Sequence, residues 1–457
     1  MTERPPQRLS PLTPVVRSFI VLVAAAWTVF RDVTQGQIGP TAVLFCLLLI
    51  GGAIFGTASW LRTTFWIEAD ELRVDTGVLS RQSRRIRIDR LQGIDIVQPF
   101  VARLFGLAEL RMDVAGGNSR EGSLAYLPLQ EAHRLRDLLL ARREELGTKE
   151  ALVPATGGLS QGAGEPDEAG VPLADAPAEL APRPPAAPER TIAAVDLGTL
   201  LLSILLSGEA IGLVVLFVGL GVTFAASGQW LGFSAMLPVL LGLGVALFRR
   251  LAANYGFTVS ETAAGMQVRR GLFELNAQTI ALKRVQGVVV SEPLLWRRLG
   301  WARLDVSIAG YGAGVDNERA APSTVLPVGD REVVHQLARH VLRGLDPAAV
   351  PLRPVPRRAR WAAPVTHRFL SVGADEHLVV SREGWLFRRT HAAPQARIQS
   401  VRITQGPWQR LLNLADVHTD SPPGPTNVRA RHRDAAEARR LFGHEVEATA
   451  LARHQQP

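Results

Sequence analysis

The chain has 457 residues, of which 47% are hydrophobic and 20% are charged, which leaves room for about three domains. A single cysteine, Cys46, excludes an intramolecular disulfide and a cysteine-based zinc cluster. The formal net charge of +9 suits nucleic acid, an anionic membrane surface or the cytoplasmic side of a membrane protein, and the apolar segments decide among these three.

Two apolar segments follow each other closely near the start of the chain. They are "SFIVLVAAAWTVF" (18–30) and "TAVLFCLLLIGGAIFGTASWL" (41–61), separated by a short polar stretch. A membrane-spanning helix takes about 20 apolar residues, so we expect a transmembrane hairpin over residues 1–62, with spans near 15–33 and 41–61. A cleaved signal peptide is the alternative for the first segment, but a second apolar segment follows at once and no small-residue cleavage site stands out.

Residues 63–147 have the pattern of a small antiparallel sheet closed by a helix. Short apolar–polar alternations in "LRVDTGVL" and "RIRIDRLQGIDIV" are typical of half-buried strands, and Gly77 between them suits a turn that needs a positive φ. In "LQEAHRLRDLLLARREE" (129–145), leucines recur at three- and four-residue spacing, which predicts an amphipathic helix. Such a helix can cover the open end of a curled sheet.

A basic cluster made of Arg81, Arg84, Arg85 and Arg87 lies within this sheet. Each basic residue near a cytoplasmic leaflet contributes about 1 kcal/mol of attraction to anionic lipid, so the cluster is a candidate contact for lipid or for a protein partner. A strand edge that stays charged to avoid aggregation gives the same pattern. The sequence leaves both interpretations open.

An acidic segment rich in Ala, Pro and Gly (148–191) comes next, and its composition predicts a flexible linker. Residues 192–250 then repeat the membrane pattern, with an interfacial helix and a second hairpin whose spans lie near 209–227 and 230–249. Glu209 has two interpretations. A carboxylate within the hydrocarbon of the bilayer costs free energy and is often functional. A carboxylate at the headgroup boundary does not have this cost and needs no function. We favour the boundary position for Glu209.

Three segments repeat one pattern without a gap: "RLQGIDIVQPFVARLFGLAELRM" (90–112), "RVQGVVVSEPLLWRRLGWARLDV" (284–306) and "RIQSVRITQGPWQRLLNLADVHT" (397–419). In each copy a Gly stands thirteen residues before the first Arg, a Gln two residues after it and a second Arg thirteen residues after it. The spacing between copies is too long and too uneven for a solenoid. We therefore expect a second domain at 251–346, a basic linker at 347–361 and a third domain at 362–457.

The repeated Arg–x–Gln is a candidate site in every copy, as Arg90 and Gln92, Arg284 and Gln286, and Arg397 and Gln399. The guanidinium groups are suited to equivalent contacts with phosphate or a partner peptide. Alternatively, the pair ties a strand edge to a neighbouring loop. Three copies of one fold would retain either kind of contact, so both interpretations stay open, and we favour the structural one.

Arginines in the short flanks of the spans set the expected orientation. They precede the first span (Arg8, Arg17) and follow the second and fourth spans (Arg62, Arg249, Arg250), whereas the turns within the hairpins carry at most one. Both hairpins should therefore enter and leave on the cytoplasmic side. We expect a multi-pass protein of the cell (inner) membrane, with its N-terminus, its C-terminus and all three domains in the cytoplasm.

No motif for chemistry accompanies these domains. The chain lacks the GxSxG, Walker A and HExxH motifs, and its ten histidines show no metal-ligand spacing. We therefore expect no catalytic residue, no metal, no cofactor and no enzymatic activity. Nucleic acid is disfavoured as a partner because no aromatic residues interleave with the basic ones.

The order hairpin, domain, hairpin, domain, domain, together with "RLSPLTPVVRS", "RLQGIDI", "RVQGVVV" and "GWLFRRTHAAPQARIQSVRITQGPWQRLLNLADVHT", resembles the bacterial membrane-flanked PH-like domain family (bPH2, DUF304), in its multi-domain YdbT-type members. The resemblance implies an α+β fold with transmembrane helices: three PH-like antiparallel barrels of about seven strands, each with a C-terminal helix, plus the two hairpins. The third copy departs from the others, with Ser400 and Asn413 in place of Gly. This departure suggests a looser or specialised third domain.

The leading hypothesis is a binding or assembly scaffold on the membrane. The resemblance implies as partner a smaller membrane protein with a single PH-like domain, and a role in envelope stress or antimicrobial-peptide resistance. Membrane lipids are the other expected partner, and a homo-oligomer is a further option. The alternatives are a component of a membrane transport or export system that uses Glu209, and an anionic-lipid binding module that uses the basic cluster.

Overall fold

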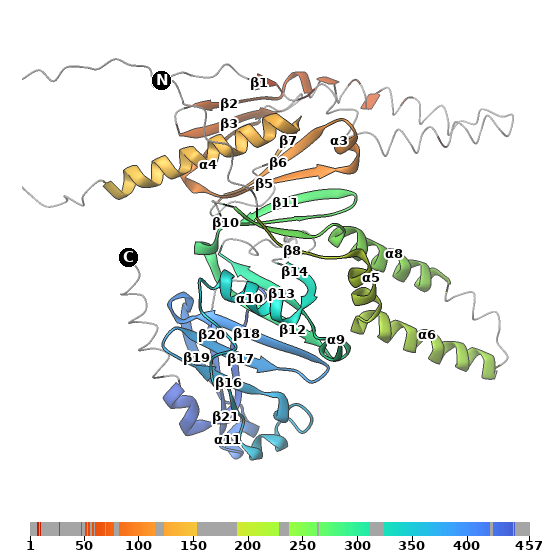
Figure 1. Cartoon of the computed structure of the whole chain (residues 1–457), viewed down its shortest axis with the longest axis vertical. Helices are drawn as coiled ribbons and strands as arrows, with labels where there is room; N and C mark the ends of the chain where they lie inside the picture. Colours follow the sequence, from red (N-terminus) through yellow and green to blue (C-terminus); the bar gives the residue numbers. More distant parts are fainter. Residues whose placement is uncertain are drawn as a thin grey trace, which may run out of the picture. The chain divides into compact units, whose positions relative to one another are not determined.

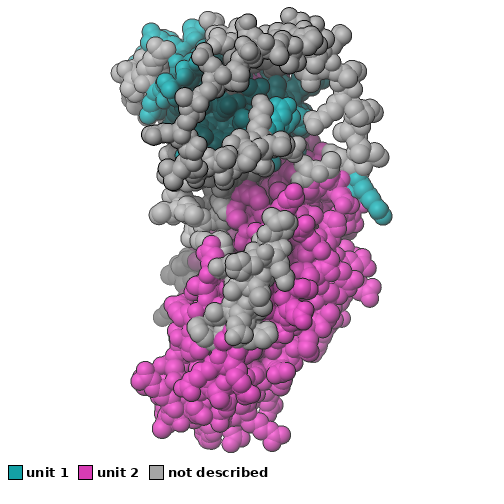
Figure 2. All heavy atoms as spheres, turned by 90° about the vertical axis from the view of Figure 1, so that its left-hand side faces the viewer, with its two compact units in different colours: residues 1–91, 129–190 teal, residues 92–128, 191–457 magenta. Residues whose placement is uncertain are grey.

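The computed structural model describes residues 7–8, 10, 60–68, 70–76, 82–114, 123–152, 190–227, 237–262, 265–309, 324–420, 424–441 and 443, with a few isolated residues between 27 and 58 (Figure 1). The chain divides into two compact units, coloured separately in Figure 2. Residues 1–91 and 129–190 form the first unit, and residues 92–128 and 191–457 form the second.

The first unit is an antiparallel sheet with one long helix. The strand order is β1 (Gln7–Arg8), β2 (Thr64–Glu68), β3 (Glu71–Thr76) and β4 (Gln82–Arg87). Leu72 and Ile86 are paired across β3 and β4 and both are buried. Helix α4 (Leu129–Leu152) contacts the 3-10 turn η1 (Ile88–Arg90). The predicted helix at 129–145 is therefore confirmed, and it extends further than expected.

The second unit contains a seven-stranded sheet to which two repeat copies contribute. The order is β7 (Ser123–Pro128), β6 (Leu107–Val114), β5 (Leu91–Pro99), β11 (Glu274–Ile280), β10 (Gly265–Arg270), β9 (Thr258–Thr262) and β8 (Arg190–Ala194). Strands β5 to β7 belong to the first copy and β8 to β11 to the second. The two copies meet where β5 pairs with β11, with Ile96 opposite Ala277.

A second seven-stranded sheet joins the second copy to the third in the same way. Its order is β14 (Thr324–Asp330), β13 (Trp301–Ile308), β12 (Val285–Pro293), β18 (Phe387–Pro394), β17 (Leu378–Glu383), β16 (Ser371–Ala374) and β15 (Arg353–Pro354). The third copy ends in a three-stranded sheet, β19 (Ser400–Thr404), β20 (Leu414–Asp420) and β21 (Arg429–Asp434). Among the described residues each copy thus has seven strands, four in one sheet and three in the next, which agrees with a PH-like fold.

The main core of the second unit lies between these sheets. Val288 and Val290 of β12, Leu304 of β13 and Ala392 of β18 belong to one buried cluster, so residues of two copies share a core. Helix α10 (Arg331–Val341) closes the second copy by burying Val334, Leu337, Ala338 and Val341. In the third copy, helical residues follow β21 from 435 to 441. The predicted closing helices are thus present in both copies.

Glycines shape the hairpin turns as the sequence predicts. Gly271 has φ 114° and Gly384 has φ 92°, and a Cβ added at either would lie 1.9 Å or 2.0 Å from a backbone oxygen across the turn. Gly77 lies outside the described residues. Asn413 has φ 49°, close to the values at Gly106 and Gly300 in the other copies, so the third copy keeps the same left-handed turn with a residue that tolerates it.

The structure also contains three short strands that the sequence analysis missed: β1, β8 and β15. Strand β8 precedes the apolar helices yet pairs with β9, which follows them. The helices are therefore an insertion between the first two strands of the second copy. In the third copy, β15 takes the place of β8, and the expected linker at 347–361 contains β15 and the 3-10 helix η3 (Arg357–Trp361). Edge strands of two to five residues are too short to give a periodic signal.

The insertion consists of α5 (Leu197–Leu205), α6 (Gly208–Ser227) and α8 (Leu237–Asn254). Within the described part of the chain, α6 is the one helix that is long and apolar enough to cross a membrane. Helix α8 carries Arg249 and Arg250 in its second half. Most of the expected spans near 15–33 and 41–61, and all of residues 230–236, lie outside the described residues, so the two hairpins remain a prediction.

Candidate functional site

The repeated Arg–x–Gln lies at the start of the fifth strand of each copy. A 3-10 turn precedes the first strand of the second sheet in every copy: η1 before β5, η2 (Leu282–Arg284) before β12 and η5 (Gln395–Arg397) before β19. Arg284 Nη2 donates to the carbonyl of Ala309, and Gln286 Nε2 lies 3.4 Å from the carbonyl of Arg284. Arg397 Nη2 donates to the carbonyl of Lys283 over 2.8 Å, which links the third copy to the second.

The remaining members of this set are placed less fully. Arg90 is exposed at the end of η1, and the side chain of Gln92 lies outside the described residues. Gln399 is exposed, and its backbone N–H donates to Asp420 over 2.9 Å. In the second and third copies the arginine thus bonds to a backbone carbonyl, within its own copy for Arg284 and in the neighbouring copy for Arg397.

The basic cluster lies on β4 of the first unit, close to carboxylates. Arg84, Arg85 and Arg87 are exposed, and Arg81 lies outside the described residues. Arg87 Nη2 pairs with Asp89 over 2.7 Å. A shallow groove beside this pair has a mostly acidic lining; its residues are Glu68, Asp70, Glu71, Arg73, Arg87, Asp89 and Leu146. Because four of these side chains are carboxylates, the groove weakens the local positive potential near Arg87.

Glu209 lies in the first turn of α6 and pairs with an arginine from α8. Arg250 Nη1 donates to Glu209 Oε2 over 2.6 Å. The pair joins the two ends of the α6–α8 segment, next to α5, whose N-terminus is capped by Asp196. A carboxylate paired at the base of the helices fits the boundary position better than a position in the hydrocarbon.

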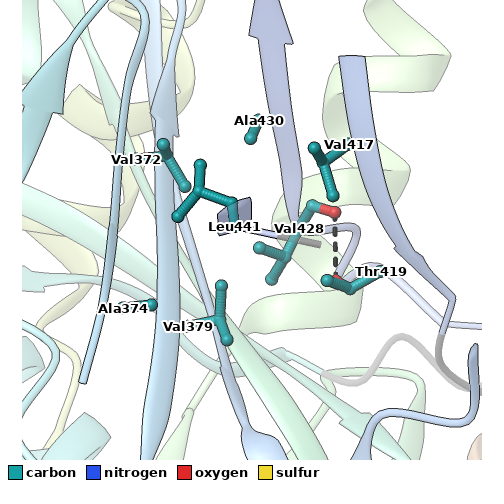
Figure 3. A pocket seen from close by; sticks show the side chains of 8 residues that line it. All are labelled: Val372, Ala374, Val379, Val417, Thr419, Val428, Ala430 and Leu441. Carbon is teal, nitrogen blue, oxygen red and sulfur yellow. Dashed lines mark hydrogen bonds between the residues drawn. The ribbon is translucent and has the colours of Figure 1, made fainter. Parts of the chain in front are cut away.

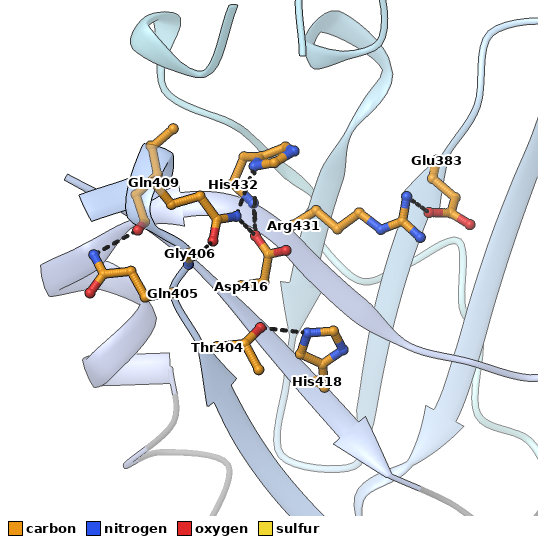
Figure 4. Close-up of polar contacts among 10 residues, drawn as sticks. Glu383, Thr404, Gln405, Gly406, Gln409, Asp416, His418, Arg431 and His432 are labelled. Atoms are coloured by element: carbon orange, nitrogen blue, oxygen red, sulfur yellow. Dashed lines mark hydrogen bonds and ion pairs between the residues drawn. The ribbon is translucent and has the colours of Figure 1, made fainter. Parts of the chain in front are cut away.

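A polar network in the third copy connects β19 to its neighbours (Figure 4). Asp416 Oδ1 accepts hydrogen bonds from Gln409 Nε2 at 2.8 Å and from the backbone N–H of His432 at 2.7 Å. Gln405 Nε2 donates to the carbonyl of Leu414 over 2.8 Å, and Thr404 Oγ1 lies 2.9 Å from His418 Nε2. These contacts fix the strand, the short helix α11 (Pro407–Leu411) and β20 as one element.

His418 and Glu383 of the third copy have shifted pKa values. Burial lowers the pKa of His418, and the positive charge of Arg429 lowers it further. The nearby imidazole of His391, with Nε2 3.7 Å from a carboxylate oxygen of Glu383, lowers the pKa of Glu383, which also pairs with Arg431 at 3.5 Å. Near neutral pH His418 is therefore uncharged and Glu383 is ionised.

The interior of the third copy contains a small apolar cavity of about 20 Å³ (Figure 3). Its lining is almost wholly aliphatic: Val372, Ala374, Val379, Val417, Thr419, Val428, Ala430 and Leu441. Thr419 Oγ1 donates to the carbonyl of Val428 over 3.1 Å, so the single hydroxyl of the lining is already bonded. A space of this size has room for about one water molecule, so it is a packing defect rather than a ligand site. Among the described residues, no group of three or more His, Cys, Asp or Glu is arranged to hold a metal.

One repeat position important for the junctions was missed in the sequence. Eight residues after the first Arg, the copies have Gln98, Glu292 and Gln405. Gln98 and Gln405 donate to equivalent carbonyls, of Leu107 and Leu414. Glu292 instead accepts from Arg331 over 2.6 Å and lies 3.6 Å from Arg388 of the third copy. A polar residue at the same repeat position in all three copies, at or just after the end of the fifth strand, was the signal that could have found it.

Comparisons with known proteins agree with this architecture. The profile of a family described as "Bacterial PH domain" matches residues 18–143, 194–345 and 354–446. The chain is 24% identical over 345 residues to the "UPF0699 transmembrane protein YdbT" of Bacillus subtilis (strain 168), across 69% of this chain and 62% of that protein. The chain thus spans somewhat less than two thirds of the relative's length. No solved structure matches. Because the family profile matches most of the chain, in three segments that correspond to the three repeat copies, the chain belongs to the bacterial PH domain family and is a membrane protein with PH-like domains.

Proposed function

We propose that this chain is a multi-pass inner-membrane protein whose three cytoplasmic PH-like domains form a non-enzymatic binding and assembly scaffold. The observation that carries the proposal is the strand pairing between copies: β5 with β11, and β12 with β18. Hydrogen-bonded sheets connect the copies more firmly than flexible linkers would. Domains joined in this way suit presentation of surfaces to a partner.

Aromatic turns support a position of the domains close to the membrane. The ring of Phe273, in the β10–β11 turn, lies 5.9 Å from that of Phe248 in α8. In the third copy Phe387 contacts Gly208 at the start of α6, where an added Cβ would lie 2.2 Å from Cζ of the ring. Trp385 and Leu386 in the same turn are about half exposed. Tryptophan is enriched at membrane–water interfaces, so the turn with Trp385 suits that position, and Phe273 holds the β10–β11 turn against α8.

The proposed partner is a smaller membrane protein with a single PH-like domain, and the proposed process is envelope stress or resistance to antimicrobial peptides. The resemblance to the family supports both. Purification from native membranes after chemical cross-linking tests the partner: a membrane protein with one PH-like domain should co-purify in a fixed ratio. A chain that purifies alone from cross-linked native membranes would contradict the proposal.

The cytoplasmic orientation is supported by the arginines that flank the expected spans. A reporter that matures only in an oxidising compartment, fused after Pro457, should stay inactive. Fusion of the same reporter to a periplasmic protein gives the positive control. An active reporter at Pro457 would overturn the proposed topology.

Two alternatives lead to separate experiments. For a transport component, Glu209→Gln should abolish function while membrane insertion stays normal; the pairing with Arg250 supports a structural role instead. For a lipid-binding module, replacement of Arg84 and Arg85 by Ala should remove binding to anionic vesicles but leave weak binding to neutral vesicles. Equal binding of the unaltered protein to both kinds of vesicle would exclude the lipid-binding module.

A further inference from the structure

The two junctions between copies use the same strand pairing in the same register. In the first, Glu274 lies opposite Pro99 and Ala277 opposite Ile96. In the second, Phe387 lies opposite Pro293 and Thr390 opposite Val290. When the copies are aligned on their repeats, these pairs coincide residue for residue. The fifth strand of a copy is thus a specific acceptor for the fourth strand of the next.

The third copy has the same acceptor strand, β19, with no donor among the described residues. The strand lies at the end of its sheet, in the order β19-β20-β21. Val288 and Val290 of β12 are 0% and 3% exposed, whereas their equivalents Val401 and Ile403 are only half buried. The difference has a direct cause, because a neighbouring strand covers β12 and none of the described strands covers the outer edge of β19.

The short helix after the acceptor strand also takes part in the second junction. Arg297 Nη2 donates to the carbonyl of Trp385 in the donor's turn over 2.6 Å. Its equivalent in the third copy is Arg410, which is exposed. Pro407 replaces Leu294, whose N–H donates to Leu386, so a junction at β19 has one backbone hydrogen bond fewer.

We propose that the outer edge of β19 binds the fourth strand of a PH-like domain on a separate protein, in the register of the two internal junctions. An unpaired strand edge is a template for such β-augmentation, in which main-chain hydrogen bonds supply affinity and side chains supply specificity. The inference rests on the proposed scaffold function and names the surface where the partner docks.

The internal junctions indicate what the partner strand must contain. Donor residues that face the shared core are small: Ala277 opposite Ile96, and Ala392 opposite Val288. The partner strand should therefore place small side chains opposite Val401 and Ile403. It should place no basic residue opposite Arg402, because like charges directly across a strand pair are destabilising.

These requirements argue against a second copy of this chain as the occupant. Its fourth strand is β4, and the shared register would place Arg85 opposite Val401, where both junctions have a smaller residue. The same register would place Arg84 opposite Arg402. A bulky cation at the core-facing position and a like-charge pair both weaken that alternative.

Site-specific photo-cross-linking on the full chain in its native membranes tests the proposal. A benzoylphenylalanine at position 402 should form an adduct with another membrane protein, and peptide mapping should place it on a strand with small residues at alternate positions in a PH-like domain. The control position is Arg368, which is exposed in the same copy away from β19. An adduct with residues 82–87 of a second copy, or equal yield from position 368, would overturn the proposal.

Failure of the edge and failure of the proposed function give different results. If a partner co-purifies but position 402 gives no adduct, β19 is not the docking edge and the scaffold function stands. If no partner co-purifies from cross-linked native membranes, the proposed function is wrong and this inference is lost with it.

Two proline variants give a second test that does not depend on the photo-reactive residue at 402. Successive N–H groups in a strand point to opposite sides, so one of Arg402→Pro and Ile403→Pro removes a bond to β20 and the other removes only a donor at the outer edge. The second kind is tolerated in an edge strand. With the cross-linker at position 404, that variant should keep its melting temperature and lose at least tenfold in adduct yield. Unchanged yield in a stably folded variant would refute docking at this edge.

Discussion

Replacement of Glu292 by alanine should loosen the junction between the second and third copies. The residue is 6% exposed on β12, and its carboxylate accepts from Arg331 at 2.6 Å and lies 3.6 Å from Arg388 on β18. Arg331 belongs to the helix that closes the second copy, so this one carboxylate connects α10, β12 and the third copy.

The magnitude follows from the exposure of the partners. A hydrogen bond to a charged group contributes about 1.5–3 kcal/mol. The side chains of Arg331 and Arg388 are 42% and 34% exposed, so both regain water when the carboxylate is removed, and the larger penalty for a buried unpaired charge does not apply. We therefore expect a loss of about 2 kcal/mol in the free energy of opening the junction.

Hydrogen–deuterium exchange of the purified protein in micelles measures this opening. A loss of about 2 kcal/mol corresponds to roughly 30-fold faster exchange of the β12 and β18 amides. Glu292→Gln should have a smaller effect, since the first and third copies have Gln at this position. Glu332→Ala is the matched control, because Glu332 is an exposed acid on α10, next to Arg331. If the β12 and β18 amides exchange at the same rate in Glu292→Ala and Glu332→Ala, the ion pairs of Glu292 do not stabilise the junction.

Three further changes test other parts of the structure. Gly384→Ala should destabilise the protein by about 1–3 kcal/mol in denaturant unfolding, because Gly384 has a positive φ and a carbonyl oxygen lies close to the added Cβ. At Gly406 the nearest atom lies 3.8 Å from an added Cβ, so Gly406→Ala should change the free energy of unfolding by under about 0.5 kcal/mol. Equal losses in the two variants would contradict the role given to Gly384. Burial lowers the pKa of His418 below the ordinary value of 6.5, so as the pH falls through 6.5 only the unfolded state takes up a proton at this residue. The contribution of His418 to stability should therefore be constant above pH 6.5 and decrease below it. His418→Gln should reduce the decrease in melting temperature between pH 7.5 and 5.5, and an unchanged decrease would refute this prediction. A polarity-sensitive dye on Leu386→Cys, in a Cys46→Ser background, should emit at shorter wavelength in lipid nanodiscs than the same dye on Ser400→Cys, and identical spectra would place the turn away from the interface.

The repeat made the fold predictable, but not its connections. An ungapped alignment of three copies places the strands, the turn glycines and the closing helices, because apolar alternation and a glycine with positive φ are local properties. The pairing of strands between copies depends on which sheet edges come together, and no local sequence pattern predicts this. The short strands β1, β8 and β15 were missed for a related reason, since pairing with a neighbour, rather than their own sequence, makes them strands.

The candidate residues show the same division. The paired Arg and Gln were found because they recur, and their contacts with backbone carbonyls are of a kind that a recurring fold needs. Glu292 was missed because it differs from the Gln found at the same position in the other two copies. Its carboxylate contacts two arginines, one of them in the next copy. Departures from a repeat therefore indicate specific contacts better than the repeated residues do.

The insertion of the apolar helices between two paired strands has a mechanical consequence. Because β8 and β9 lie side by side, the chain leaves one sheet, passes through α5, α6 and α8, and returns to the same sheet. The second copy is therefore connected to both ends of the inserted apolar helices. In the third copy, η3 and η4 (His367–Phe369) replace those helices between β15 and β16. Its position then depends on its contacts with the second copy, which include the β12–β18 pairing, the turn at Trp385–Phe387 and the hydrogen bond from Arg397 to Lys283. No described strand pairs with the outer edge of β19, and this is the edge that we propose a domain of another protein extends.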